Sequence, residues 1–162
     1  VGISVEIAAV GLGLVGLFGV GGQIGIGYVS DRIGREWGWT ISVIGFLITY
    51  VLLILLSIWP EVWLMYLMSC MQGLVGYGLA SVFASVPAEL FAGKRYGSIF
   101  GLLGALAGLG AAFGPWFTGF LFDQMGNYNA AFWVAIVMCA LSIFTMWLAA
   151  PRKVRLVAGQ IR

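Results

Sequence analysis

The segment GYVSDRIGRE, residues 27–36, separates two long apolar runs and carries an unusual share of the chain's charge. The 162 residues include only eight basic and six acidic side chains, yet four of these charged residues lie in this one segment. They are Asp31, Arg32, Arg35 and Glu36. Because the runs on both sides are uncharged over the length of a long helix, the segment is predicted to connect two apolar helices.

The composition indicates a membrane protein. The chain is 62% hydrophobic and 9% charged, whereas about 25% of residues in an ordinary soluble domain are charged. A helix needs about 20 apolar residues to cross a hydrocarbon core of about 30 Å. The sequence contains five such runs, none with a lysine or arginine: residues 7–28, 37–58, 62–85, 97–122 and 129–150. We therefore expect an all-α protein with five transmembrane helices in residues 1–150, followed by a basic tail, 151–162.

The distribution of basic residues predicts the orientation. All eight lie in three segments, the 29–36 loop, the 86–96 loop and the tail, which are alternate connections along a five-helix path. The remaining connections carry the acids Glu6, Glu61 and Asp123. Since cytoplasmic loops are enriched in Lys and Arg, we expect the three basic segments, including the C-terminus, on the cytoplasmic side of the cell (plasma or inner) membrane.

The polar inventory argues against an enzyme. The chain has no histidine, and both cysteines, Cys70 and Cys139, lie inside apolar runs. A membrane-embedded enzyme needs His, Cys or carboxylate groups that converge within the membrane, and the runs offer no such set. We therefore expect no catalytic residues, no metal site and no cofactor, and we do not expect nucleic acid as a partner.

The charged loop resembles a signature of the major facilitator superfamily of secondary transporters, G-x-x-x-D-R-x-G-R-[RK]. The matching residues are Gly27, Asp31, Arg32, Gly34 and Arg35. The last basic position of the signature is Glu36 in this chain, which is a departure. The resemblance implies a latch that closes the cytoplasmic side: Asp31 would face the N-terminus of a helix in the other half of the carrier, and both arginines would pair with nearby acids. Glu89 is the acid that the next inner loop offers. The alternative interpretation is a solvated, positively charged loop.

Further segments resemble the same superfamily. Gly101, Gly110, Gly114, Pro115 and Gly119 match its glycine–proline helix motif, with Thr118 at the position of one further glycine. Their predicted role is helix packing or a hinge, because Pro115 removes a backbone hydrogen bond and should bend the helix. Pro87 is expected to end the third helix. The segments 89–101 and 122–132 are similar to two connections of monocarboxylate- and oxalate/formate-type members.

The order of these segments implies helices eight to twelve of the superfamily fold, which make up most of its C-terminal six-helix bundle. On this interpretation the N-terminal half and the seventh helix precede the chain. The implied function is secondary active transport of a small solute by alternating access, with an organic anion or monocarboxylate as one substrate class. Two alternatives stay open: a drug or metabolite exporter of the same superfamily, and a structural or receptor-like subunit that transports nothing. The implied partners are the solute, a co-transported proton or counter-ion, the lipid bilayer and the N-terminal half.

Candidate substrate contacts are few. Monocarboxylate-type members often have an arginine four residues before the first glycine of the signature, and this chain has Gln23 there. In the third run, Ser69, Gln72 and Gly76 share one helical face, with Tyr77 nearby. These polar groups predict either a substrate pocket or hydrogen bonds between helices.

Overall fold

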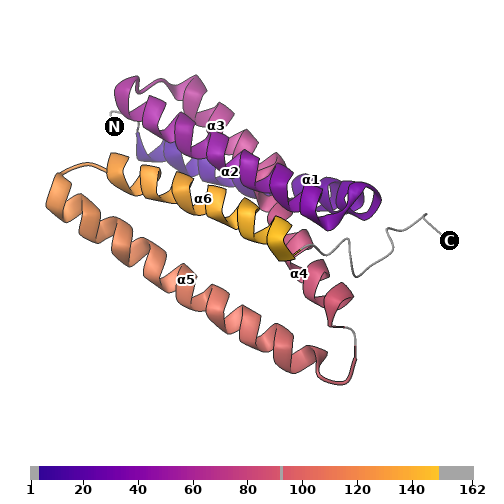
Figure 1. The fold of residues 1–162 in the computed structure, drawn as a ribbon. Coiled ribbons are helices and arrows are strands. Elements are labelled where there is room, and N and C mark those ends of the chain that lie inside the picture. Colours follow the sequence, from indigo (N-terminus) through magenta and orange to yellow (C-terminus); the bar gives the residue numbers. More distant parts are fainter. Residues whose placement is uncertain (1–3, 92, 150–162) are drawn as a thin grey trace.

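The computed structural model describes residues 4–91 and 93–149, and every regular element within them is a helix (Figure 1). The elements are α1 (Val5–Ile33), α2 (Arg35–Ile58), α3 (Val62–Leu74), the 3-10 helix η1 (Gly76–Gly78), α4 (Leu79–Leu90), α5 (Tyr96–Met125) and α6 (Asn129–Ala149). When α3, η1 and α4 are taken as one path, five segments are long and apolar enough to cross a membrane. The predicted all-α membrane fold is confirmed.

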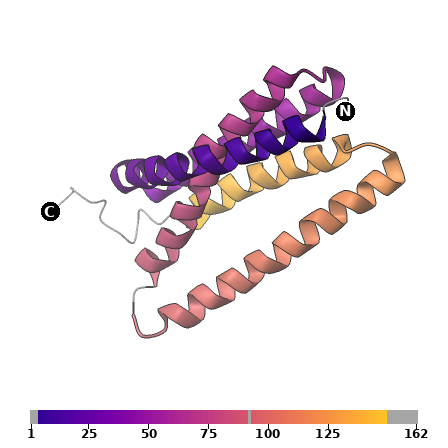
Figure 2. The same cartoon turned by 180° about the vertical axis from the view of Figure 1, so that it is seen from behind.

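The helices form a packed group with one helix set apart. α1, α2 and α3 pack against one another, α6 lies along α2, and α5 stands away from them for most of its length (Figures 1 and 2). No described residue of α5 is buried. Two aromatic contacts attach it near its ends: Phe100 to Phe83 of α4, with ring centroids 6.3 Å apart, and Phe122 to Tyr128, at 4.4 Å.

Glycines set the sharp ends of two helices. Gly34 alone joins α1 to α2, and its φ of 114° is a conformation that residues with a Cβ atom rarely adopt. Gly126 follows α5 with a φ of 68°, and its N–H donates to the Phe122 carbonyl at 2.7 Å. This is the left-handed ending that glycine favours.

The third predicted helix is interrupted, which corrects the expectation of a continuous helix over 62–85. The α-helix stops at Leu74, tightens into η1 and resumes as α4. Glycines on both sides of the break weaken the helix, and α2 packs directly against it. A Cβ atom at Gly45 of α2 would lie 2.7 Å from Val75 Cγ1 and 2.9 Å from the Gly76 nitrogen.

The expectation that Pro87 ends the third helix is also wrong, since α4 continues to Leu90. Proline lacks an N–H but keeps its carbonyl, and the Phe91 N–H donates to the Pro87 oxygen at 2.9 Å. The helix therefore loses the hydrogen bond that a backbone N–H at position 87 would donate, and it keeps the one that the Pro87 carbonyl accepts.

The tightest crossing joins α1 to the end of α3. A Cβ atom at Gly22 would collide with the Gly73 carbonyl oxygen and lie 2.7 Å from that of Leu74. A Cβ atom at Gly73 would lie 2.8 Å from the Val15 oxygen. The two backbones are therefore in direct contact, as at small-residue interfaces between membrane helices.

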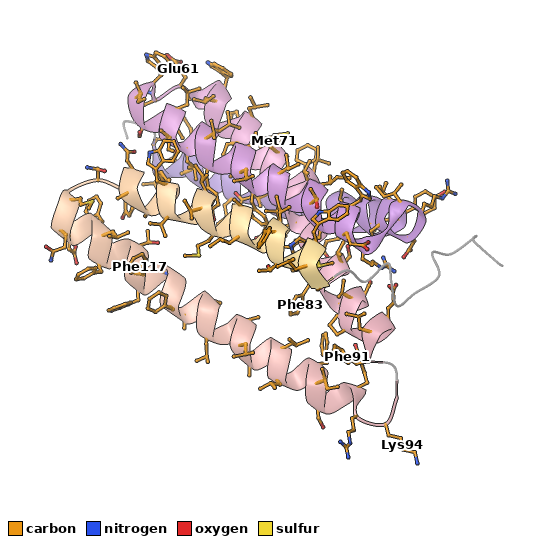
Figure 3. The ribbon with its side chains drawn as sticks, viewed as in Figure 1. Glu61, Met71, Phe83, Phe91, Lys94 and Phe117 are labelled. Carbon is orange, nitrogen blue, oxygen red and sulfur yellow. The ribbon has the colours of Figure 1, made fainter. Side chains whose placement is uncertain are left out.

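The turns alternate between the two ends of the bundle. The α1–α2 turn and the α4–α5 connection lie at one end, and the α2–α3 and α5–α6 turns lie at the other (Figures 1 and 2). Figure 3 shows Lys94 and Glu61 at these opposite ends. The basic tail, 151–162, lies outside the described residues.

Candidate functional site

A cluster of charged side chains, here called the Arg35 cluster, joins the ends of three helices. Arg35 begins α2, and its side chain is only 10% exposed. Its Nε donates to Glu89 Oε1 of α4 at 2.9 Å, and its Nη1 donates to Ser30 Oγ of α1 at 2.5 Å. Its Nη2 forms ion pairs with Glu89 Oε1, at 2.9 Å, and with Asp31 of α1. The planar guanidinium fork thus binds α1 and α4 to the start of α2 at once.

The members of the cluster differ in exposure. The side chains of Asp31 and Glu89 are 52% and 24% exposed, so both carboxylates are reachable while paired. Glu36, the departure from the loop signature, is 1% exposed in the first turn of α2. A carboxylate is favoured near a helix N-terminus because unpaired backbone N–H groups point toward it.

The expected ion pair of Arg35 with Glu89 is present. The expected pairing of Arg32 with an acid stays a prediction, because no acid within residues 4–91 and 93–149 forms an ion pair with it. The Arg32 guanidinium lies 4.2 Å from the centroid of the Tyr28 ring instead. Arg32 lies in the last turn of α1 and is exposed, whereas Arg35 begins the next helix after the Gly34 turn. The contact of Arg32 with Tyr28 is therefore a cation–π interaction at the surface.

Two residues of the site were not predicted from the sequence. Ser30 is fully buried, and its Oγ donates to the Gly27 carbonyl at 2.9 Å while accepting from Arg35. Gly38 of α2 lies against it, because a Cβ atom there would collide with Ser30 Cβ and approach Val82 Cγ2 to 3.2 Å. The available signal was a small hydroxyl residue next to Asp31, one helical turn after Gly27.

Gly27 itself faces α4. A Cβ atom at this glycine would lie 3.4 Å from Ser81 Oγ, which is ordinary van der Waals contact. The signature residues Gly27 and Gly34 therefore occupy a helix contact and a tight turn, and both lie beside the Arg35 cluster.

A second candidate site is a cavity of about 420 Å³ beside the break between α3 and α4, here called the η1 cavity. Its lining residues are Phe46, Gln72, Gly76, Tyr77, Leu79, Ala80 and Phe83. Gln72 and Tyr77, two of the four sequence-predicted pocket residues, are thus brought together.

The other two pocket candidates lie elsewhere. Ser69 is buried, donates to the Met65 carbonyl at 2.9 Å, and faces α1, where a Cβ atom at Gly11 would lie 3.1 Å from its Oγ. Gln23 is exposed on α1 and does not line the η1 cavity. The face that Ser69 was expected to share with Gln72 and Gly76 is therefore divided between a helix contact and a cavity.

The glycine–proline motif lies on α5, which continues through Pro115. Gly114, Pro115 and Thr118 line a second hollow, of about 790 Å³, together with residues of α2 and α6. Cβ atoms at Gly101, Gly110 and Gly114 would meet no described atom within 4 Å. Their packing and hinge role stays a prediction.

Metal-binding chemistry is not assembled in this part of the chain. Within residues 4–91 and 93–149, no three His, Cys, Asp or Glu side chains come close enough together to hold a metal ion.

Five long apolar helices, joined by short turns, define a multi-pass membrane protein. The sequence profile of the Major Facilitator Superfamily matches residues 1–160. The chain belongs to this superfamily.

Several curated relatives cover most of the chain. It is 37% identical over 131 residues to the class B tetracycline resistance protein of Escherichia coli, which covers 80% of this chain and 31% of that protein. It is 27% identical over 130 residues to a triacylglyceride transporter of Mycolicibacterium hassiacum, covering 80% of this chain and 24% of the relative. Against a triacylglyceride transporter of Mycobacterium tuberculosis the identity is 23% over 126 residues, covering 78% and 24%. No solved structure matches the chain.

The chain therefore spans about a quarter to a third of the length of these relatives. None of the three is named for a monocarboxylate or for oxalate, so the finer resemblance to those members stays a prediction.

Proposed function

We propose that the full-length protein is a secondary active transporter that moves a small solute across the cell membrane by alternating access. The observation that carries this proposal is the Arg35 cluster, which ties three helix ends together and keeps the Asp31 carboxylate half exposed. Membership of the superfamily supports a transporter rather than an enzyme. A co-transported proton or counter-ion and an N-terminal half complete the proposed machinery.

The cluster acts as the latch in this mechanism. Arg35 holds Asp31 and Glu89 in fixed positions, so a helix N-terminus of the opposite half meets a carboxylate that is already oriented. The partial positive charge of that N-terminus is attracted to Asp31, which stabilises the state closed to the cytoplasm. Opening toward the cytoplasm breaks this contact, and the two bundles rock about a site near the middle of the membrane.

Of the two substrate classes expected from the sequence, drug or metabolite export is favoured over organic-anion transport. The similar proteins are named for tetracycline resistance and triacylglyceride transport. In addition, the η1 cavity and the hollow beside α5 are lined by uncharged residues. A carboxylate that leaves water needs an opposite charge or hydrogen-bond donors in its place, and the described linings supply no cation.

We expect Asp31→Asn to shift the full-length protein toward the state open to the cytoplasm. A charge at a helix N-terminus is typically worth about 0.3–2 kcal/mol, which corresponds to a change of about 2- to 30-fold in the conformational equilibrium. The measurement is the labelling rate of Ala84→Cys, an exposed position of α4, by an impermeant maleimide in inside-out vesicles. Cys70 and Cys139 are replaced by alanine in all variants.

Asp123→Asn is the matched control, because Asp123 is an exposed acid at the other end of the bundle. It should leave the Ala84→Cys labelling rate unchanged. If Asp31→Asn inserts normally and also leaves the rate unchanged, the loop is a solvated connection rather than a latch.

The proposed orientation has its own test. In intact cells, an impermeant maleimide should label Glu61→Cys and leave Lys94→Cys unmodified, because we expect the basic turns to face the cytoplasm. Permeabilised cells provide the control, since both positions are exposed and should then react. Labelling at position 94 but not at 61 in intact cells would reverse the orientation.

A further inference from the structure

The η1 cavity lies near the middle of a membrane-spanning path. The path runs from Val62 to Leu90, and Gly76 of η1 is close to its centre. Transporters commonly bind their solutes near the midplane, beside helices that are interrupted there. The cavity volume, about 420 Å³, falls in the range of about 300–1,000 Å³ that small-molecule sites occupy.

Three aromatic side chains wall the cavity, and each has a defined contact. The Phe46 ring lies over Gly76, where a Cβ atom would be 3.3 Å from its Cε1 and Cζ. The Tyr77 ring lies against Gly19 of α1, with 3.4 Å from a Cβ atom there to Cδ1. Phe83 is near Phe100 and lies on the side of α4 that faces α5 (Figure 3). These contacts restrict the rings, so a flat apolar ligand can stack on them at little entropic cost.

Gln72 supplies the one side-chain amide among the described lining residues. Among the residues that the structure describes, it makes no hydrogen bond, although it lies half-buried within a membrane span. An amide in such a place gains from a partner, because leaving it unpaired in apolar surroundings is costly. Its carbonyl accepts and its NH₂ group donates, so a single hydroxyl, carbonyl or amide on a ligand can satisfy it.

None of the described residues that line the cavity carries a charge. An ionised ligand would therefore lose its hydration without gaining an opposite charge. From the rings, the single amide and this neutrality we propose that the η1 cavity binds a neutral, largely apolar, ring-containing molecule through one hydrogen bond to Gln72. The inference rests on the proposed transport function and names the substrate class of its site. A lipid acyl chain, the other apolar occupant, would leave the Gln72 amide unpaired.

The test compares two probes, naphthol and naphthoate, which share a fused ring system and differ in carrying a hydroxyl or a carboxylate at neutral pH. Equilibrium binding is measured on the full-length protein in lipid nanodiscs, with empty nanodiscs subtracted. We expect saturable binding of naphthol and at least about tenfold weaker binding of naphthoate, because the cavity offers no counter-charge.

Two variants assign the binding to this cavity. Gln72→Leu should weaken naphthol binding about 5- to 150-fold, the range for a hydrogen-bonding group left buried and unpaired. Ala80→Phe adds a ring at an exposed lining position and should abolish binding by filling the cavity. The matched control is Gln124→Leu, the same substitution at an exposed position near the end of α5, which should leave naphthol binding unchanged.

Equal affinity for the two probes, or no saturable binding of naphthol, would overturn the inference. So would loss of binding in Ala80→Phe with full affinity in Gln72→Leu, which is the behaviour of an acyl-chain groove. In each of these cases the Asp31→Asn labelling experiment still decides the transport function, since it uses no substrate. If labelling shifts as expected while naphthol fails to bind, the transporter stands and its substrate class is wrong.

Discussion

Gly22→Ala should destabilise the full-length protein by about 1–3 kcal/mol, the usual cost of forcing extra atoms into a packed interface. The new Cβ atom would collide with the Gly73 carbonyl oxygen and lie within 2.7 Å of that of Leu74. Both are backbone atoms, so no side chain can rotate away from the added methyl group. The two helices must separate instead, and the contact that holds α1 at the break after α3 is lost.

The neighbouring glycine provides a matched control. A Cβ atom at Gly21 would meet nothing within 4 Å among the described residues, and alanine is better than glycine inside a helix by about 0.5–1 kcal/mol. Gly21→Ala should therefore be neutral or slightly stabilising. Thermal unfolding of the purified protein in detergent measures both variants. Similar melting temperatures for the two would contradict the close crossing.

The number and type of helices could be predicted because the bilayer imposes them. An apolar run must be long enough to cross the hydrocarbon core and must satisfy its own backbone, and both conditions are visible in the sequence. The break at η1 is different, because it depends on how closely Gly22 of α1 and Gly45 of α2 approach α3. Such an approach is a property of three packed helices, and hydropathy along one of them does not contain it.

The candidate sites were also predictable only in part. The loop signature pointed to Arg35, and Glu89 was the acid that the next inner loop offered. The two residues are far apart in the sequence and form an ion pair in the structure. Arg32 lies over the Tyr28 ring, a contact that the loop signature did not indicate, and its pairing with an acid stays a prediction. Ser30 has no charge to mark it, and its role follows from burial next to Gly38.

The pocket candidates show the same limit. Ser69 and Gln72 are three residues apart, and helical spacing places them on one broad face. α1 covers the part of that face that contains Ser69, while the part with Gln72 stays open to the η1 cavity. Which polar residue is covered is decided by the neighbouring helix, so the sequence pattern alone cannot separate a helix contact from a ligand contact.

Arg35→Met should have the largest effect of any single change in the Arg35 cluster, lowering stability by about 3 kcal/mol. Removing one partner of a buried ion pair typically costs about 3–5 kcal/mol, because the other charge is left buried and uncompensated. The lower end applies here, since Glu89 is 24% exposed and Asp31 is 52% exposed. The stability of Arg35→Lys should fall between that of the unsubstituted protein and that of Arg35→Met. A lysine ammonium is a point charge that pairs with Glu89 but cannot also bridge to Ser30 and Asp31.

The double variant Arg35→Met/Glu89→Met separates stability from the latch. The double variant removes the more buried of the two carboxylates that Arg35→Met leaves uncompensated, so it should unfold at a higher temperature than Arg35→Met alone. On the proposed mechanism the conformational bias should not recover, because Asp31 has lost the guanidinium that we propose orients it toward the opposite half. The Ala84→Cys labelling rate should therefore stay as high in the double variant as in Arg35→Met. If stability and labelling recover together, Arg35 supports the fold alone, and the orientation of Asp31 does not depend on it.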